Sequence, residues 1–373
     1  MQIVHIAAEM AGLAKIGGLG DMVSGLSKNL SLQGHRVTVF LPRYKKINLK
    51  NLLEETCTMN GLSFKAYSYF LENVQIVLID PAPTLDYYNR PNIYGYADDP
   101  ARFIFLCRAA LEYLKQKQLQ VDILHLHDWH ASIAAFLYKE IYLRQNQGPW
   151  IKKILLNLHN VGFQGLCSLD ELERIGVDKN LYWNNAKVKE AKTGKLNLLQ
   201  AGLNYSDKLV AVSHNYAEEI LTPMGGAGLE PVFWQNKAKL TGLLNGIDYQ
   251  IWNPETDVGI IANYSAHDSL EKIRQAKQQS KSFIQARFNL RQKEAPLIIN
   301  IGRLAEQKAP EAILWSVDNV LSRQGQFIVL GSSLVDSIQK QFSEKQKQTA
   351  PTQDTAFIFE FNESLAHLLY AAA

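Results

Sequence analysis

The stretch Lys15-Ile16-Gly17-Gly18-Leu19-Gly20-Asp21 carries residue types suited to holding a phosphate. Glycines without Cβ atoms let a backbone approach a bulky ligand closely, and a helix N-terminus offers unpaired N–H groups and partial positive charge to an anion. Lys15 adds an ammonium group. The stretch follows an apolar run and opens an amphipathic one, so we predict a phosphate-facing turn between a strand and a helix.

Two further groups of polar residues stand at the ends of apolar runs: His125-Leu126-His127-Asp128-Trp129-His130 and His159-Asn160. Because the carboxyl ends of parallel strands meet at one edge of a sheet, we expect both groups beside the glycine loop, forming a site for a polar ligand. Histidines two apart on a strand share a face and suit zinc, so a metal site is an alternative interpretation of the first group. Taken singly, Asp128 also fits a helix cap and His159 a hydrogen-bonded turn residue.

Basic residues follow an apolar run in the second half of the chain. Arg303 and Lys308 flank the loop Leu304-Ala305-Glu306-Gln307 and can both reach one diphosphate, the arginine as a bidentate donor and the lysine as a point charge. A solvated basic turn is the alternative interpretation. Between the two halves, Asn245-Gly246 is a turn dipeptide placed for a hinge or cleft role.

Several other chemistries lack their signatures. The sequence shows no separated acidic pair suited to Mg²⁺ beside a sugar nucleotide, no Ser-His-Asp elbow and no GxGxxG fingerprint. We therefore predict no metal and no cofactor, with the basic pair neutralising a leaving diphosphate instead.

The elements that must position these residues alternate between strand and helix patterns, which predicts an α/β protein with helices on both faces of parallel sheets. Two domains, residues 1–240 and 241–373, fit the chain length. The second sheet is short and the last helix stops abruptly, so we expect the second domain to be incomplete. Predicted strands cover 3–8, 36–41, 64–70 and 74–79 (paired as a hairpin), 121–127, 153–159, 208–213, 297–301, 327–330 and 356–359. Predicted helices cover 18–34, 101–114, 129–143, 193–205, 215–221 and 269–290, with others starting near 309, 335 and 363.

Composition excludes some partners. The 39 basic and 36 acidic residues among 373 give a net charge of +3, which does not favour binding to nucleic acid or to a membrane surface. The three cysteines have no metal-type spacing, and no apolar run reaches the length of a membrane span. We expect a cytoplasmic protein with reduced thiols. The sequence leaves the oligomeric state unknown.

With these motifs in view, the chain resembles bacterial glycogen synthases and plant starch synthases, which are retaining glucosyltransferases that use ADP-glucose. The matching stretches occur in family order along essentially the whole chain. They are Ala8-Glu9-Met10-Ala11, Lys15–Asp21, Leu41-Pro42-Arg43-Tyr44, Arg90-Pro91, Tyr94-Gly95, His127-Asp128-Trp129-His130, His159-Asn160, Gln164-Gly165, Ala201-Gly202, Ala211-Val212-Ser213, Thr222-Pro223, Leu244–Asp248, Trp252-Asn253-Pro254 and Arg303–Lys308.

The resemblance implies a GT-B fold, in which two Rossmann-like domains face each other across a cleft, here with the second incomplete. It implies transfer of glucose from ADP-glucose to the non-reducing end of an α-1,4-glucan such as glycogen, with retention. By the same resemblance, Asp128 and His159 contact the transferred glucose, with His159 near the reacting centre. The remaining implied site residues bind donor phosphate, donor glucose or acceptor: Lys15, Gly17, Gly18, Asn160, Asn245, Arg303 and Lys308.

The chain departs from the family pattern at three places. Ile16 stands where relatives usually have Ser or Thr, and Ala309 where they usually have Gly. The family also continues beyond the segment 366–373 with a paired-glutamate motif and a nucleotide-binding loop. Two alternative hypotheses therefore stay open beside an active synthase: a truncated, catalytically silent protein that binds glucan, and a metal-dependent hydrolase using His125–His130.

Overall fold

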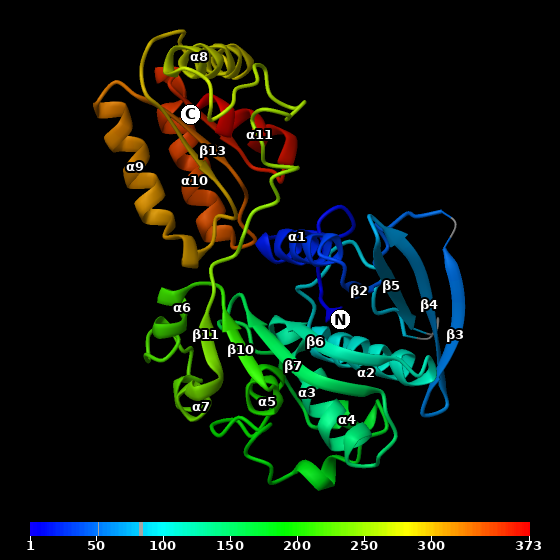
Figure 1. Cartoon of the computed structure of the whole chain (residues 1–373). Helices are drawn as coiled ribbons and strands as arrows, with labels where there is room; N and C mark the ends of the chain where they lie inside the picture. The colour runs from blue at the N-terminus through cyan, green and yellow to red at the C-terminus, as the bar shows by residue number, and fades with distance from the viewer. Residues whose placement is uncertain (51, 82–84) are drawn as a thin grey trace. The chain divides into compact units, whose positions relative to one another are not determined.

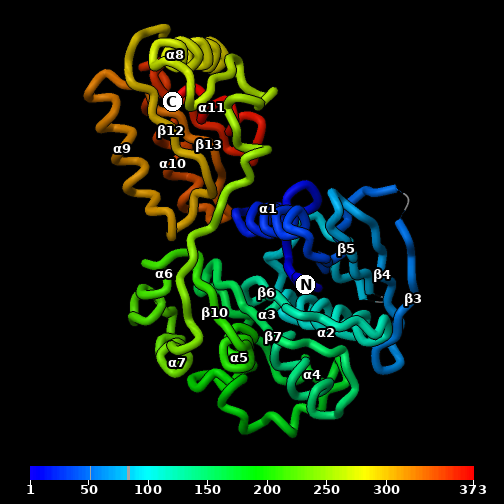
Figure 2. The backbone as a smooth tube through the Cα atoms, viewed as in Figure 1, coloured from blue at the N-terminus to red at the C-terminus, as the bar shows by residue number. Residues whose placement is uncertain are grey.

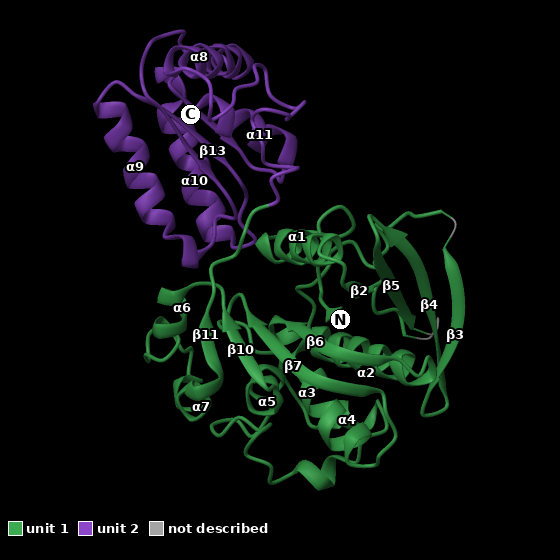
Figure 3. Ribbon diagram, in the orientation of Figure 1, with its two compact units in different colours: residues 1–247 green, residues 248–373 purple. Residues whose placement is uncertain are grey.

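The computed structural model describes residues 1–50, 52–81 and 85–373 (Figure 1). The chain forms two compact units, Met1–Ile247 and Asp248–Ala373, which Figure 3 colours separately. The expected boundary after residue 240 falls inside the first unit. Both units are built of strands and helices around parallel sheets, so the predicted α/β class is confirmed.

Unit 1 is organised around one large sheet, with nine strands in the order β11-β10-β7-β6-β1-β2-β5-β4-β3 among the described residues. Figure 2 lets the reader follow the chain as it enters at the central strand β1, builds outward to β3, and returns to add β6 to β11 on the other side. All neighbouring pairs are parallel except β3–β4 and β4–β5. The strands are β1 (Gln2–Ile6), β2 (Arg36–Pro42), β3 (Leu53–Met59), β4 (Leu62–Leu71), β5 (Val74–Pro81), β6 (Gln120–His127), β7 (Trp150–Leu158), β10 (Lys208–Ala211) and β11 (Leu240–Gly242). A separate small pair consists of β8 (Leu166–Cys167) and β9 (Leu196–Asn197).

The two faces of this sheet carry different cores. Val4 and Ile6 of β1 pack with the residues of α2 (Asp99–Gln116) and α3 (Asp128–Leu137). Val37 and Val39 of β2 pack instead with α1 (Gly18–Leu32). The remaining helical segments of unit 1 are α4 (Asp170–Glu173), α5 (Leu198–Tyr205), α6 (His214–Glu219), α7 (Glu230–Gln235), the π-helical η1 (Tyr138–Leu143), and the 3-10 turns η2 (Lys179–Tyr182) and η3 (Lys237–Lys239).

One local prediction for unit 1 is wrong, and one strand was not predicted. The helix expected over 193–205 begins only at Leu198, because the side chain of Asn197 accepts the N–H of Gln200 and caps it there. The strand β3 was not expected, because its residues are mostly polar. It forms at the sheet edge, where Cys57 and Met59 are buried and the alternate side chains face outward.

Unit 2 contains a three-stranded parallel sheet in the order β12-β13-β14. One core packs α8 and α11 against it, and the other packs α9 and α10, so helices cover both faces. The elements are α8 (Leu270–Arg287), β12 (Leu297–Ile301), η4 (Glu306–Lys308), α9 (Pro310–Ser322), β13 (Gln326–Leu330), α10 (Asp336–Thr349), η5 (Ala350–Thr352), β14 (Thr355–Ile358) and α11 (Glu363–Ala372). Across both units, no helix of the described chain has the length and apolar character to cross a membrane.

Candidate active site

Asp128 sits at the junction of β6 and α3 and ties together the ends of two strands. Its carboxylate is buried, and Oδ1 accepts the backbone N–H groups of His159 at 2.6 Å and Asn160 at 3.1 Å. The backbone of Asp128 is left-handed, with a φ of 57°, a conformation that Asp tolerates better than most residues. The helix-cap interpretation is wrong, since the N-cap of α3 is His127 and no side chain caps it.

The imidazole of His159 lies just beyond the end of β7, within reach of two neighbours. Its Nε2 is 3.1 Å from Nδ2 of Asn157 and 3.4 Å from Nδ1 of His127. Burial lowers the pKa of His159 to about 4, so the ring is neutral at pH 7. Burial also raises the pKa of Asp128 to about 7. The hydrogen bonds from the two backbone N–H groups lower this pKa and so offset part of the rise.

Glu9 holds the glycine loop from inside. Its buried carboxylate accepts the N–H groups of Ile16 at 2.6 Å and Gly17 at 2.9 Å, and Tyr94 donates its hydroxyl to the other oxygen at 2.7 Å. The first N–H groups of the loop are therefore already used. Of the anion site expected there, only the start of α1 at Gly18 is left, because the leading N–H groups of this helix have no intrahelical acceptor.

The side of the loop facing away from Glu9 is open. A Cβ added at Gly17 or Gly18 would meet nothing within 4 Å. Lys15 pairs with Asp21 at 2.6 Å, so its ammonium is held at the loop. Sequence reasoning assigned no role to Glu9, although a lone acid three residues beyond an apolar strand and shortly before a glycine loop is a usable signal.

The glycine loop and the Asp128–His159 junction lie at the same edge of the sheet. Tyr94 bridges them, because its hydroxyl contacts Glu9 while its ring lies 5.3 Å from the ring of His130. The structure therefore brings together six of the predicted residues of unit 1: Lys15, Gly17, Gly18, Asp128, His159 and Asn160.

Asn245 lies apart from that group in the chain, in an exposed segment after β11 that forms no turn. The strand ends at Gly242, and Leu243 extends its pairing by one hydrogen bond to Ala211. The prediction that Asn245-Gly246 closes a strand with a turn is therefore wrong.

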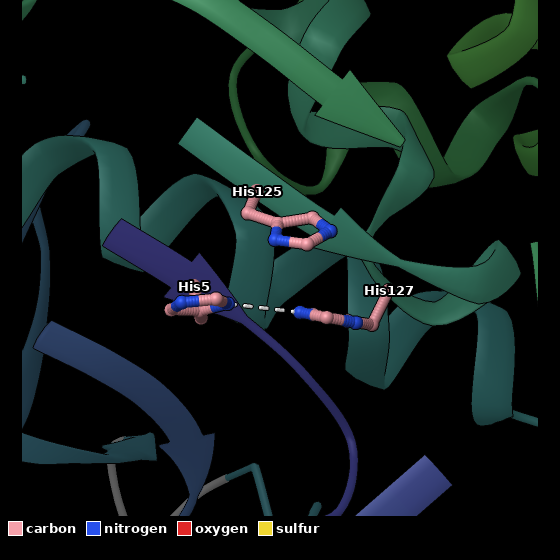
Figure 4. Close-up of side chains that lie close together, drawn as sticks. All are labelled: His5, His125 and His127. Atoms are coloured by element: carbon pink, nitrogen blue, oxygen red, sulfur yellow. Dashed lines mark hydrogen bonds between the residues drawn. The ribbon is translucent and has the colours of Figure 1, made fainter. Parts of the chain in front are cut away.

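Three imidazoles, those of His5, His125 and His127, lie close together at the same edge (Figure 4). They lie on the face of the sheet that α2 and α3 do not cover. His5 of β1 lies opposite His125 of β6 in the parallel register. Nδ1 of His5 is 3.0 Å from Nε2 of His127, and each of the three rings places one nitrogen within 4.8 Å of the others. His5 was missed because it stands alone in an apolar run more than a hundred residues from its partners.

The metal-site interpretation of residues 125–130 does not match this arrangement. His130 points elsewhere, stacking on Trp129 at 4.1 Å and lying against Phe103. Both nitrogens of His127 already have imidazole partners, so a metal ion would have to break one of those contacts. We therefore treat the cluster as a hydrogen-bonded network.

The buried histidines predict acid sensitivity of unit 1. Burial lowers the pKa of His5 and His159 to about 4 and of His130 to about 3, and it holds the pKa of His125 and His127 well below the usual value. These groups take up protons on unfolding, so the stability they provide is complete above pH ~6.5 and is lost as the pH falls toward ~4. The raised pKa of Asp128 acts the other way between about 3.8 and 7, but through one group against five.

We expect the free energy of unfolding of unit 1 to drop between pH 7.5 and 5.5, by about 1.4 kcal/mol per pH unit for each extra proton bound by the unfolded chain. Urea titrations at constant ionic strength measure it. The contribution of the histidines should not change between pH 7.5 and 8.5. An equal midpoint at pH 5.5 and 7.5 would contradict the buried, neutral state of these rings.

Arg303 and Lys308 lie in unit 2, in the loop that joins β12 to α9. Both side chains are exposed, and neither makes a hydrogen bond or ion pair with any described residue. The loop is anchored by buried Leu304, whose N–H donates to Ser332 at 3.0 Å. A Cβ at Gly331 would lie 1.8 Å from the carbonyl oxygen of Gly302, so only glycine fits where the two loops meet.

Ala309 completes that loop in a left-handed conformation, with a φ of 49°. An L-residue with a Cβ pays about 1–2 kcal/mol there, and glycine avoids that cost while losing about 0.5–1 kcal/mol of chain entropy. We expect Ala309→Gly to raise the free energy of unfolding of unit 2 by about 0.5 kcal/mol, measured by urea denaturation.

The matched control is Ala305→Gly, because Ala305 lies in the same loop with an extended backbone at a φ of −132°. Only the entropic loss applies there, so this variant should be destabilised. If both variants lose stability equally, the conformation of Ala309 carries no strain.

The chain was compared with known families and proteins. The family model described as the starch synthase catalytic domain matches residues 2–235. Over 388 residues the chain is 37% identical to the glycogen synthase of Protochlamydia amoebophila, covering 100% of this chain and 77% of that protein. It is 32% identical over 385 residues to glycogen synthase 1 of Trichormus variabilis, again covering 100% of this chain and 77% of the relative.

A solved structure is similar as well. The catalytic domain of starch synthase IV from Arabidopsis thaliana, bound to ADP and acarbose, matches with a TM-score of 0.91 and 33% identity. The match covers 100% of this chain and 76% of that one.

Proposed function

Because the chain belongs to the family of glycogen and starch synthases, we propose that it transfers glucose from ADP-glucose to the non-reducing end of an α-1,4-glucan, with retention of the anomeric configuration. The GT-B fold and the glucosyltransferase class follow from the family and from the similar solved structure, and both confirm the expectation from sequence. ADP as the nucleotide is supported by the ADP bound to the similar starch synthase structure. The partners are then a nucleotide sugar and a glucan.

The observation that carries the proposal is the shared edge of the sheet where the glycine loop meets Asp128 and His159. In this reading, His159 and Asp128 contact the transferred glucose or hold the groups that do, and Asn160 lines the same turn. Lys15, Gly17 and Gly18 approach donor phosphate and acceptor from the open side of the loop. Asn245 belongs to the donor region.

Arg303 and Lys308 are assigned to the diphosphate. When the bond from the anomeric carbon to the diphosphate oxygen breaks, negative charge grows on the departing ADP, and cations that bind this charge lower the barrier. The new bond forms between the anomeric carbon and an acceptor hydroxyl oxygen, whose proton leaves with the diphosphate. No change of oxidation state occurs, so no redox cofactor is needed.

We also propose a cytoplasmic location. Cys57, Cys107 and Cys167 are free thiols, and two of the three are buried. Unpaired cysteines are typical of a reducing compartment.

The test is transfer of labelled glucose from ADP-glucose to glycogen by the purified protein, with UDP-glucose as the competing donor. Label in the glycogen that an α-1,4-specific hydrolase releases would support the proposal. Glycogen co-sedimentation without transfer would overturn it in favour of a glucan-binding protein. Transfer from UDP-glucose alone would overturn the choice of nucleotide.

A further inference from the structure

We propose that Asn157 and His127 are positioning residues that hold His159 in the neutral tautomer with its proton on Nδ1. This inference rests on the proposed function, because it concerns how His159 meets the transferred sugar. A neutral imidazole has one N–H and one bare nitrogen, so its tautomer decides whether a given ring edge donates or accepts.

Asn157 supplies the first hydrogen-bond donor to the His159 ring. It is buried on β7, and its Nδ2 lies 3.1 Å from Nε2 of His159. A side-chain amide nitrogen only donates, so Nε2 of His159 must accept.

His127 supplies a second, more distant donor, which shares the single lone pair of the same nitrogen. It lies opposite Asn157 in the register of β6 and β7, and its Nδ1 is 3.4 Å from Nε2 of His159. Nε2 of His159 is already an acceptor, so the proton of neutral His127 belongs on Nδ1. The other nitrogen of His127 is then bare and accepts from Nδ1 of His5 at 3.0 Å.

The rest of the network agrees with this direction. Once His5 donates from Nδ1, its Nε2 is a bare nitrogen, and that atom is buried with no hydrogen-bond partner among the described residues. Burial lowers the pKa of all three rings, which keeps each to a single proton at pH 7. The chain of imidazoles therefore has one direction, from His5 through His127 to His159.

The arrangement determines what the other ring nitrogen of His159, Nδ1, can do. Its backbone N–H is fixed by Asp128 at 2.6 Å, and its Nε2 faces two donors. The ring therefore presents Nδ1–H as a donor, suited to a sugar hydroxyl and unsuited to act as a base. A site of this kind is preorganised, since no proton has to move before the sugar binds.

The test reads the tautomer directly by ¹⁵N NMR of protein labelled at histidine, together with steady-state kinetics. The wild-type His159 should show its proton on Nδ1. In the double variant His127→Phe/Asn157→Leu both donors are gone, and we expect mixed tautomers and a kcat lowered about 30-fold or more, with KM for ADP-glucose changed less than about threefold. Each single variant keeps one donor and should lose less than about threefold.

Rescue and control separate positioning from structural damage. His127→Asn/Asn157→Leu returns an amide nitrogen near the position of Nδ1, so it should restore the tautomer and most of kcat. Asn236→Leu, a buried asparagine elsewhere in unit 1, should cost stability but leave the His159 signals unchanged. A wild-type His159 protonated on Nε2, or a double variant with wild-type signals, would overturn the inference.

The inference and the proposed function fail separately. If the protein transfers glucose but His159 carries its proton on Nε2, only the inference is wrong. If no glucose is transferred, the proposed function is wrong whatever the tautomer.

Discussion

Lys308→Ala is expected to lower kcat for transfer from ADP-glucose by about 10²–10³-fold. The lysine is assigned to the diphosphate, where negative charge grows as the glycosidic bond breaks, and the loss of one well-placed charge donor at such a site costs about that much. Its side chain is exposed and bonded to no described residue, so its removal should leave unit 2 folded. Initial rates at saturating glycogen, with ADP binding measured by calorimetry, test this prediction.

Lys340→Ala is the matched control, since Lys340 is an exposed lysine on α10 of the same unit. It should leave kcat within about twofold of the wild type, as expected for a surface substitution. Lys308→Arg should retain part of the rate because the charge remains. Equal rates for Lys308→Ala and the wild type would remove Lys308 from the diphosphate site.

Asp128→Ala is expected to lower both stability and activity. The partly buried backbone N–H groups of His159 and Asn160 would lose their acceptor, at a cost of up to about 1–3 kcal/mol each. Alanine also fits the left-handed backbone at this position less well than Asp does. The turn that carries His159 would then be released, and a misplacement of about 1 Å at such a residue costs on the order of 10²-fold in rate.

Asp207→Ala provides the comparison for Asp128→Ala. Asp207 also holds a backbone N–H, that of Ile154 at 2.8 Å, but in the middle of β7 and away from the end that precedes His159. Its loss should reduce the free energy of unfolding without a fall in kcat beyond about threefold. Asp128→Asn, which keeps an acceptor oxygen and tolerates the backbone, should lie between Asp128→Ala and the wild type. If the two alanine variants lose activity equally, Asp128 has no special link to the site.

Much of the fold was predictable because apolar runs mark buried parallel strands regardless of what they pair with. The strands β1, β2, β6, β12 and β13 lie where their runs predicted, within a residue or two, and β7 begins three residues before its predicted start. The edge strand β3 was not predicted, because a mostly polar, half-exposed strand shows little of the apolar pattern by which strands are recognised. The start of α5 escaped because one hydrogen bond from Asn197 decides it.

The candidate site was predictable only in part. Asp128, His159 and the glycine loop stand directly after apolar runs, so their placement at one edge followed from the rule for parallel sheets. Their roles stay predictions. What Asp128 does could not be read from sequence, because the backbone N–H groups that donate to it lie just beyond another strand, β7. His5 escaped for the same reason, since pairing of β1 with β6 brings its partners close. Glu9 escaped because its partners are two backbone N–H groups of the glycine loop and the distant Tyr94.

The position of β1 in the sheet also determines how long one of its edges stays unpaired while the chain is being synthesised. Of the strands in this sheet it precedes all others in the chain, yet one of its two neighbours, β6, begins only at Gln120. At about 5–20 residues per second, β1 waits on the order of ten seconds with one edge unpaired. The nascent chain therefore carries an open apolar strand edge through the early part of translation. The polar edge that joins Glu9, Asp128 and His159 is assembled only after β7 has left the exit tunnel.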